Sequence, residues 1–280
     1  MPVGKPLTEF ALQQFLPRPE NALLTESRAD GRSWSAQRQL YVKAAVCDRA
    51  KGSAYLEQGE TKIMALVFGP SEIARGEDVT ITTGLLSVQL RLAPFARPER
   101  VQRPGRLHDL PTERELELEQ IVVDAFKPCV CLDKYPMAQI QIHVSVLEDD
   151  GSALPATLSC VSLALADGGI LMYDLVIGRS LIMLDERLLL DPSRSEEDDV
   201  LGLTECRQKF PFSGILCLGY MPSINQISCY YQRGRSQIDL LAKAQKELME
   251  SARTVLPILH EALLIPFKQK LSEKQQEENT

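Results

Sequence analysis

Hydrophobic and polar residues alternate along several short stretches of the chain, with the period of two that is typical of half-buried strands. The alternation is cleanest over residues 86–92 and 140–146, where every second residue is Leu, Ile or Val. Turn-forming residues at Gly59 and at Gly69-Pro70 end neighbouring stretches of the same kind. The pattern predicts further strands at residues 40–46, 53–57, 61–68, 215–220 and 226–231.

Three longer stretches carry apolar residues at helical spacing instead. The first opens with Thr112 and Glu115, which have the spacing of a capping box. The second, residues 154–166, is rich in small residues, so we expect it to be buried. The third starts near Ser236 and should kink at Pro257. Groups of strands with intervening helices predict an α+β fold, in which mixed sheets pack against helices.

The domain organisation follows from where the regular patterns start and stop. Residues 1–27 contain four prolines, which interrupt regular structure, and are expected to form a flexible N-terminal segment. Residues 28–267 contain no Ser- or Gly-rich linker and are expected to form a single domain. Residues 268–280 are polar and are expected to form a C-terminal tail.

Composition narrows the class of protein. The content of 44% hydrophobic and 25% charged residues is that of an ordinary globular protein. No apolar run reaches the roughly 18 residues that span a bilayer, and the N-terminus lacks the layout of a secretory signal. We therefore expect no membrane segment. The net charge of −7 argues against a broad nucleic-acid-binding face, so any contact with RNA must be local or shared with partner chains.

Cysteine usage points to no metal or cofactor. The seven cysteines are an odd number and lie mostly in apolar runs, which is typical of buried free thiols in a reducing compartment. The close pair Cys129 and Cys131 lacks both the usual two-residue spacing of zinc ligands and a second ligand pair. The histidines at positions 108, 143 and 260 are far apart and are interpreted as packing or surface residues.

An ordered series of motifs resembles the RNase PH family, in particular the RNase PH-like ring subunits of the RNA exosome. The resemblance covers about residues 28–265 and implies the RNase PH-type fold, which is like domain 2 of ribosomal protein S5. Details near residues 51–56, 147–154 and 172–176 are most similar to one branch of these subunits, the mRNA-transport-regulator type. The motifs are Arg28-Ala-Asp-Gly-Arg32, Lys51 to Lys62, Ala93-Pro-Phe95, Glu113-Arg-Glu115, Asp150-Gly-Ser152, Leu163 to Asp167, Met172 to Leu175 and Met221 to Gln226.

Active members of this family cut RNA from its 3′ end with inorganic phosphate. The resemblance places their phosphate-binding Gly-Ser-Arg at Gly151-Ser152-Ala153, where the arginine is missing. A charge-assisted hydrogen bond contributes roughly 1.5–3 kcal/mol, so phosphate affinity should fall by about one to two orders of magnitude. Ser152 is then interpreted as a helix N-cap.

Two further positions depart from the active pattern. The family's arginine pair reads Glu113-Arg114, and Arg114 is expected either to touch an RNA phosphate or, preferably, to pair with a neighbouring Glu. The general-acid carboxylate falls at Ile215, and residues 208–221 contain no Asp or Glu. The chain is therefore expected not to be an enzyme. The alternative is a phosphorolytic 3′–5′ exoribonuclease, acting alone or through a composite site shared with a partner.

The acidic run at residues 196–199 offers one more candidate site. Consecutive carboxylates in a strand or loop point apart and are usually solvated, so we expect no magnesium site there.

RNA contact is expected at a cluster of arginines. Residues 91–106 contain five arginines and one acidic residue, and the prolines and glycine of the second half predict a loop. In the resembled subunits this region faces a central channel for single-stranded RNA, whose phosphates arginine binds whatever the sequence. The candidate RNA-binding residues are Arg97, Arg100, Arg103 and Arg106, with Arg75 and Arg114 as further candidates.

The resemblance implies an architectural role. Similar subunits form a hetero-hexameric ring with other RNase PH-like subunits, capped by proteins with S1 and KH domains and joined by a separate catalytic ribonuclease. The implied processes are maturation of ribosomal RNA and turnover of mRNA, in the nucleus, nucleolus and cytoplasm.

Overall fold

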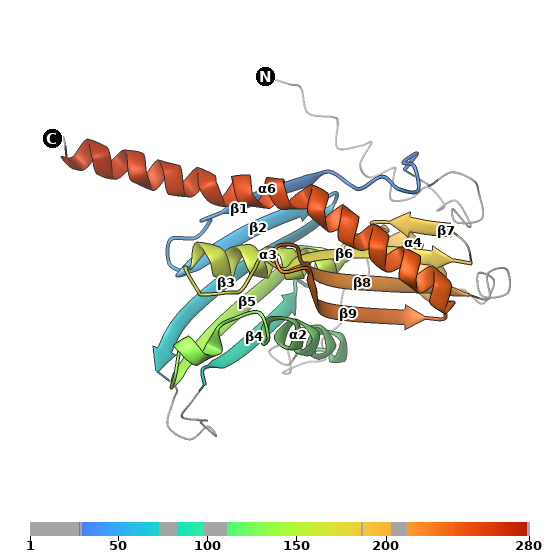
Figure 1. Cartoon of the computed structure of the whole chain (residues 1–280), viewed down its shortest axis with the longest axis horizontal. Coiled ribbons are helices and arrows are strands. Elements are labelled where there is room, and N and C mark those ends of the chain that lie inside the picture. Colours follow the sequence, from blue (N-terminus) through green and yellow to red (C-terminus); the bar gives the residue numbers. More distant parts are fainter. Residues whose placement is uncertain are drawn as a thin grey trace.

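The computed structural model describes residues 28, 30–72, 83–97, 111–185, 187–202 and 212–278. A five-stranded sheet has the order β1-β2-β3-β5-β4 (Figure 1). All of its neighbours are antiparallel except β4 and β5, which are parallel. Its strands are β1 Leu40–Ala44, β2 Gly52–Gln58, β3 Thr61–Glu72, β4 Leu85–Leu92 and β5 Ala138–Glu148.

A second, four-stranded sheet is antiparallel throughout, with the order β7-β6-β8-β9. Every residue of β6 and β8 is buried, so neither strand has a solvent-facing side. The strands are β6 Ile177–Leu184, β7 Arg187–Leu190, β8 Ser213–Met221 and β9 Gln226–Gly234.

The helix α3 (Ala153–Asp167) packs against strands of both sheets and forms the centre of the molecule (Figure 1). Its residues from 153 to 165 are all buried, as its small side chains predict. The backbones approach so closely that a Cβ on Gly52 would collide with Ala164, and one on Gly178 with Pro155. One continuous core therefore contains side chains from both sheets and from the helices between them.

The remaining helices cover the sheets. The helix α2 (Glu113–Phe126) packs on β4 and β9, and its Thr112 and Glu115 form the predicted capping box. The 3-10 helix η3 (Leu132–Lys134) follows it. The helix α4 (Arg194–Gly202) contacts β8, and α6 (Ile238–Glu278) lies across β1, β6 and β8.

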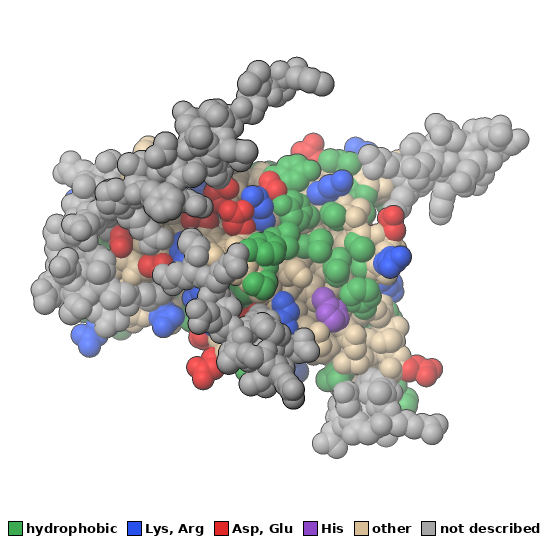
Figure 2. Space-filling view, turned by 180° about the vertical axis from the view of Figure 1, so that it is seen from behind, with side chains coloured by type: hydrophobic (Ala, Val, Ile, Leu, Met, Phe, Trp, Pro, Cys, Tyr) green, Lys and Arg blue, Asp and Glu red, His purple; other side chains and the backbone are tan. Residues whose placement is uncertain are grey.

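The opposite face of the five-stranded sheet carries no helix in the described part of the chain. A band of hydrophobic side chains between charged groups is visible on this side of the molecule (Figure 2). Tyr41, Phe68 and Leu85 belong to the outward positions of this sheet and are exposed, and the ring of Phe68 meets His143 edge-on.

The predicted strands and helices are present, the kink at Pro257 stays a prediction, and the structure contains elements that were not predicted, η3 among them. The sequence analysis predicted neither β6 nor the short β7, and β6 shows no alternation because it is buried on both faces. It also missed α4, which contains the acidic run. Finally, α6 continues to Glu278 across Pro257 and Pro266, so the stretch from residue 268, predicted to be a tail, extends the helix. The predicted segment of residues 1–27 lies outside the described residues.

Cysteine burial agrees with the sequence analysis: Cys129, Cys160, Cys217 and Cys229 are buried, and burial raises the pKa of Cys129 to about 11. No helix in the described ranges combines the length and apolar character that a bilayer-spanning segment requires.

Candidate functional site

A cavity of about 380 Å³ opens where α2, α3 and α4 meet β6, β8 and β9. It brings together Arg114, Ser152 and Ile215, which the sequence analysis had assigned to one site from three separate motifs. Glu197 and Arg194 of α4 also line it, and these two residues were not predicted to take part.

The start of α3 is held by the protein's own acceptors. The backbone N–H of Ser152 donates to Oε1 of Glu197 at 2.8 Å. The hydroxyl of Ser152 donates to the carbonyl of Pro192 at 2.9 Å and accepts from the hydroxyl of Ser180 at 2.9 Å. Ser152 occupies the predicted N-cap position of α3, but its side chain makes no capping hydrogen bond. Its backbone is left-handed (φ 53°), and its hydroxyl is turned away from the first helical N–H groups.

Glu197 is a carboxylate placed where a bound anion would lie. Burial raises its pKa to about 7, against the opposing effect of the Ser152 N–H, and the charge of Asp149 raises it further. The N-terminus of a helix favours negative charge because its first N–H groups lack partners within the helix. In this protein a side chain of α4 supplies that charge.

The interpretation of residues 196–199 as a solvated run in a strand or loop fails, because the run lies in α4 and Glu196 is buried. Glu196 is buried and accepts two hydrogen bonds from Arg28, at 2.9 and 2.8 Å. Asp198, in contrast, is exposed. A helix directs successive side chains about 100° apart, so α4 turns Glu196 and Glu197 inward while Asp198 stays outside. No cluster of three or more metal-ligating side chains occurs among the described residues.

The sequence did contain a signal for α4. Ser193 and Glu196 have the spacing of a capping box, and the backbone N–H of Ser193 donates to Oε2 of Glu196 at 2.8 Å.

Arg114 lies at the cavity without a partner of opposite charge. We find no ion pair or hydrogen bond for it within the described ranges, so the predicted pairing with a neighbouring Glu is wrong. Burial lowers its pKa, and the nearby charges of Arg97 and Arg194 lower it further. The charges of Asp149 and Glu197 oppose this lowering, so Arg114 lies among charges of both signs.

Arg97 is engaged within the protein. Its Nη2 lies 2.7 Å from Oδ2 of Asp149, and Nε donates to the same oxygen at 2.9 Å. Arg194 donates to that oxygen as well, at 3.1 Å. Arg97 therefore anchors the described part of the arginine-rich segment, and the other candidate arginines of that segment follow it in the sequence. Its predicted contact with RNA stays a prediction, as do those of Arg100, Arg103, Arg106 and Arg75, which lie outside the described residues.

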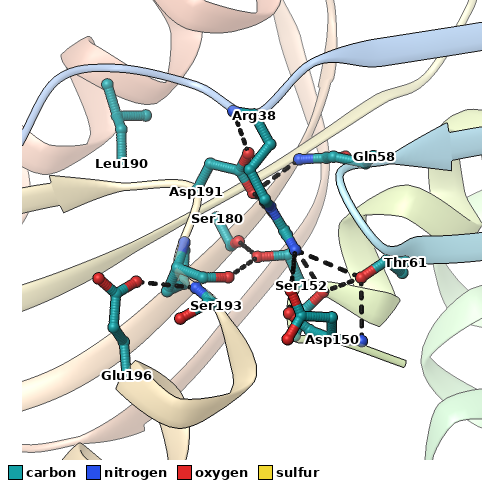
Figure 3. A network of polar contacts seen from close by, with 12 residues as sticks. Arg38, Gln58, Thr61, Asp150, Ser152, Ser180, Leu190, Asp191, Ser193 and Glu196 are labelled. Carbon is teal, nitrogen blue, oxygen red and sulfur yellow. Dashed lines mark hydrogen bonds and ion pairs between the residues drawn. The ribbon is translucent and has the colours of Figure 1, made fainter. Parts of the chain in front are cut away.

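A buried polar network behind the cavity joins the two sheets (Figure 3). The guanidinium of Arg38 donates to Oδ1 of Asp191 at 2.7 Å and to the carbonyl of Asp150 at 2.9 Å (Figure 3). Burial alone would raise the pKa of Asp191, but its contacts with Arg38 lower it. Thr61 donates to the carbonyl of Gly151 at 2.8 Å. The network positions the turn that precedes α3, and sequence reasoning did not identify Arg38 or Asp191.

Ile215 has a packing role. It is buried and belongs to a small apolar cluster with Ile182, Leu189 and Val200. The described part of β8 and of its preceding turn contains no carboxylate, as predicted, but α4 brings Glu197 to the same cavity. The cavity lining combines Arg114 and Arg233, which form no ion pair with a described residue, the paired Arg194, and Glu197, whose pKa burial raises to about 7.

Comparison with known proteins gives consistent relatives. Residues 36–171 match the RNase PH family, described as the 3′ exoribonuclease family, domain 1. The chain is 33% identical to the exosome complex component Rrp41 of Pyrobaculum aerophilum over 88% of this chain and 94% of that protein. It is 35% identical to the exosome complex component MTR3 of Homo sapiens over 81% of this chain and 82% of that protein.

Solved structures share the fold. Rice (Oryza sativa) Rrp46 superposes with a TM-score of 0.69 and 20% identity, over 85% of this chain and all of that one. A chain of the Archaeoglobus fulgidus exosome, described with RNA bound to the active site, superposes with a TM-score of 0.67 and 22% identity, over 90% of this chain and 98% of that one. These likenesses show the fold that the sequence analysis expected.

Proposed function

The chain belongs to the RNase PH family, and on that premise we propose that it is a ring subunit of the RNA exosome without catalytic activity of its own. Its relatives include exosome components, and the sequence similarity covers most of their length. The motifs near residues 51–56, 147–154 and 172–176 favour the mRNA-transport-regulator type among them.

One observation carries the non-catalytic part of the proposal. The carboxylate of Glu197 lies at the start of α3, where an anion would bind, and it accepts a hydrogen bond from the N–H of Ser152. Phosphate would have to displace a carboxylate, and it would meet the methyl group of Ala153 in place of a guanidinium. The attacking group of a phosphorolytic reaction therefore has no prepared place to bind.

The absence of a carboxyl group on β8 supports the same conclusion. Ile215 packs against aliphatic side chains and offers no exchangeable proton. A working site would need a carboxyl group there, or another one within hydrogen-bonding reach of the leaving oxygen.

A phosphorolytic exoribonuclease is the second candidate, and a specific observation favours it. Glu197, with a pKa of about 7, lies in the same cavity as Arg114, which has no partner of opposite charge among the described residues. A carboxyl group that is partly protonated at neutral pH is suited to general-acid catalysis. Against this role, its Oε1 is already engaged by Ser152.

The decisive experiment separates the two candidates. The purified chain is incubated with uniformly labelled single-stranded RNA and inorganic phosphate, alone and after assembly with RNase PH-like partner subunits, and the released nucleoside diphosphates are measured. Glu197→Gln serves as the matched variant, because it keeps an acceptor for Ser152 but cannot donate an acidic proton. We expect no phosphate-dependent product in any sample. Product that disappears in Glu197→Gln would make the chain an enzyme.

In the assembled ring, the segment that Arg97 anchors would form one wall of a channel for single-stranded RNA. Arg100, Arg103 and Arg106 would contact phosphates there, and Arg114 and Arg75 are secondary candidates. Caps with S1 and KH domains and a separate ribonuclease would complete the assembly for ribosomal RNA maturation and mRNA turnover. Native mass spectrometry of the protein from its source cells tests this composition, and isolation of the chain by itself would contradict it.

The corresponding location is the nucleus, the nucleolus and the cytoplasm. Fluorescence imaging of the tagged chain in its source cells tests this part of the proposal, and confinement to another compartment would contradict it.

A further inference from the structure

One edge of the strand β1 has no neighbouring strand in the described part of the chain. Its only strand partner within the described ranges is β2. Two hydrogen bonds that flank the strand, from Gly59 N–H to the Gln39 carbonyl and from Ala45 N–H to the Ser53 carbonyl, set the alternation of the antiparallel ladder. Odd-numbered residues of β1 therefore bond to β2, and the peptide groups of Val42 and Ala44 point away from it.

A groove of about 700 Å³ lies at this edge. One side is formed by residues 41–45 and by the hairpin that follows them, and the other by Ala262, Ile265 and Pro266 of α6. The helix lies beside β1 and then continues past the body of the molecule (Figure 1). Tyr41 and Ile265 are each about half exposed, at 55% and 52%. An uncovered strand edge beside apolar side chains is a template for a further strand.

The charged residues that line the groove determine which kind of added strand it would bind. Lys43 and Lys51 line it, and neither forms an ion pair with a described residue. Arg49 of the same hairpin is exposed and also has no such pair. Of the two acidic residues in the lining, Asp167 is engaged at the base, where it accepts from the Ser53 N–H at 2.9 Å. The second, Asp48, is exposed and is outnumbered by the three basic residues. The accessible charge is therefore mainly positive, on a chain whose net charge is −7.

We propose that this groove binds an extended acidic segment of a partner protein, which adds a strand to the free edge of β1. The segment would exchange backbone hydrogen bonds with Val42 and Ala44. Its alternate side chains would point to opposite faces, apolar ones toward Ile265 and Pro266 and acidic ones toward Lys43. Backbone bonds give affinity in this mode of recognition, and the alternating side chains give specificity.

The test uses the full chain and two fluorescent nine-residue peptides, one alternating Glu with Val and the other alternating Lys with Val. Fluorescence anisotropy measures the affinity of each peptide. We expect the acidic peptide to bind about tenfold more tightly or better, and to slow hydrogen exchange of the Val42 and Ala44 amides. Equal affinities, no binding of the acidic peptide, or protection confined to another strand would overturn the proposal.

Two variants locate the site. Lys43→Glu combined with Lys51→Glu should weaken the acidic peptide at least about tenfold, whereas Lys127→Glu at the distant end of α2 should leave the affinity unchanged. Val42→Pro removes one outward N–H from an edge strand, where proline is tolerated, and should also weaken binding. An unchanged affinity in the folded double variant would overturn the proposal.

Sedimentation equilibrium addresses a different occupant. Concentration-dependent dimers that disappear in Lys43→Glu with Lys51→Glu would assign the groove to a second copy of the chain and reject the acidic segment. A monomer at all concentrations agrees with the proposal. Neither result depends on the ring assembly or on whether the chain has catalytic activity.

Discussion

Arg28 and Glu196 are 168 residues apart in the sequence, and in the structure the guanidinium of one faces the carboxylate of the other. Their side chains are 1% and 2% exposed, and two hydrogen bonds of 2.9 and 2.8 Å join them. The arginine also donates to the carbonyls of Leu190 and Asp191, both at 2.9 Å. The first arginine of the Arg28-Ala-Asp-Gly-Arg32 motif thus holds α4, the helix that carries Glu197, against the end of β7.

Breaking this pair should destabilise the protein strongly. Glu196→Gln leaves the guanidinium of Arg28 buried without a counter-charge, a change that typically costs about 3–5 kcal/mol. We expect a loss of this order in the free energy of unfolding, measured by urea denaturation. The matched control is Asp198→Asn, two residues along α4 on its exposed side, which should change stability by less than about 0.5 kcal/mol. Similar effects of the two variants would contradict the structural role of the pair.

The raised pKa of Glu197 predicts a pH dependence of stability. Between the unfolded-state pKa of about 4.3 and the folded-state pKa of about 7, the folded protein binds more protons at this group than the unfolded chain does. The contribution of Glu197 to the free energy of unfolding therefore falls as the pH rises through this window. Allowing for partial exposure, we expect a decrease of about 1–2 kcal/mol.

The measurement is the difference between the wild type and Glu197→Gln in urea unfolding from pH 4.5 to pH 8. The amide cannot titrate, so the stability of the variant relative to the wild type should rise with pH. A difference that stays constant across the window would show that the carboxyl group has an ordinary pKa.

Restoring a phosphate site should require two changes. Ala153→Arg alone returns a guanidinium to the cavity, but Glu197 still accepts the hydrogen bond of the Ser152 N–H. Ala153→Arg combined with Glu197→Gln removes the competing charge, and we expect inorganic phosphate to bind at least about tenfold more tightly than to the single variant. Isothermal titration calorimetry measures both affinities. If Ala153→Arg alone binds phosphate as tightly as the double variant does, Glu197 does not block the site.

The arginines of residues 97–106 should separate into an anchor and a set of RNA contacts. Arg97→Ala leaves Asp149 with Arg194 as its remaining ion-pair partner, so it should lower stability by about 1–3 kcal/mol. Charge reversal of Arg100, Arg103 and Arg106 should instead leave stability unchanged and weaken protection of RNA threaded through the assembled ring.

Thermal unfolding and nuclease protection, applied to both variants, test this separation. Full RNA protection after the triple charge reversal would remove this segment from the RNA path. A stability of Arg97→Ala equal to that of the wild type would mean that the pair with Asp149 does not anchor the segment.

Local sequence was sufficient for much of the fold. Alternation with a period of two determines which face of β4 and β5 is buried, and the small residues of 154–166 require a helix packed closely on its neighbours. The capping box of Thr112 and Glu115 fixes where α2 begins. Each of these features depends on residues only a few positions apart, so the pattern and the structure report the same short-range physics. The resemblance to the RNase PH family was also enough to assign Arg114, Ser152 and Ile215 to one site, and all three line one cavity.

Only the tertiary structure decided what those residues do there. The hydroxyl of Ser152 bonds to Pro192, its N–H bonds to Glu197, and Arg97 bonds to Asp149, across separations of 40, 45 and 52 residues. A run of acidic residues is equally compatible with a solvated loop and with a helix that turns two carboxylates inward. Which of these two structures forms depends on whether buried arginines and backbone N–H groups without another partner lie opposite the acidic run. Those partners come together only through the packing of the two sheets on α3, which no local pattern encodes.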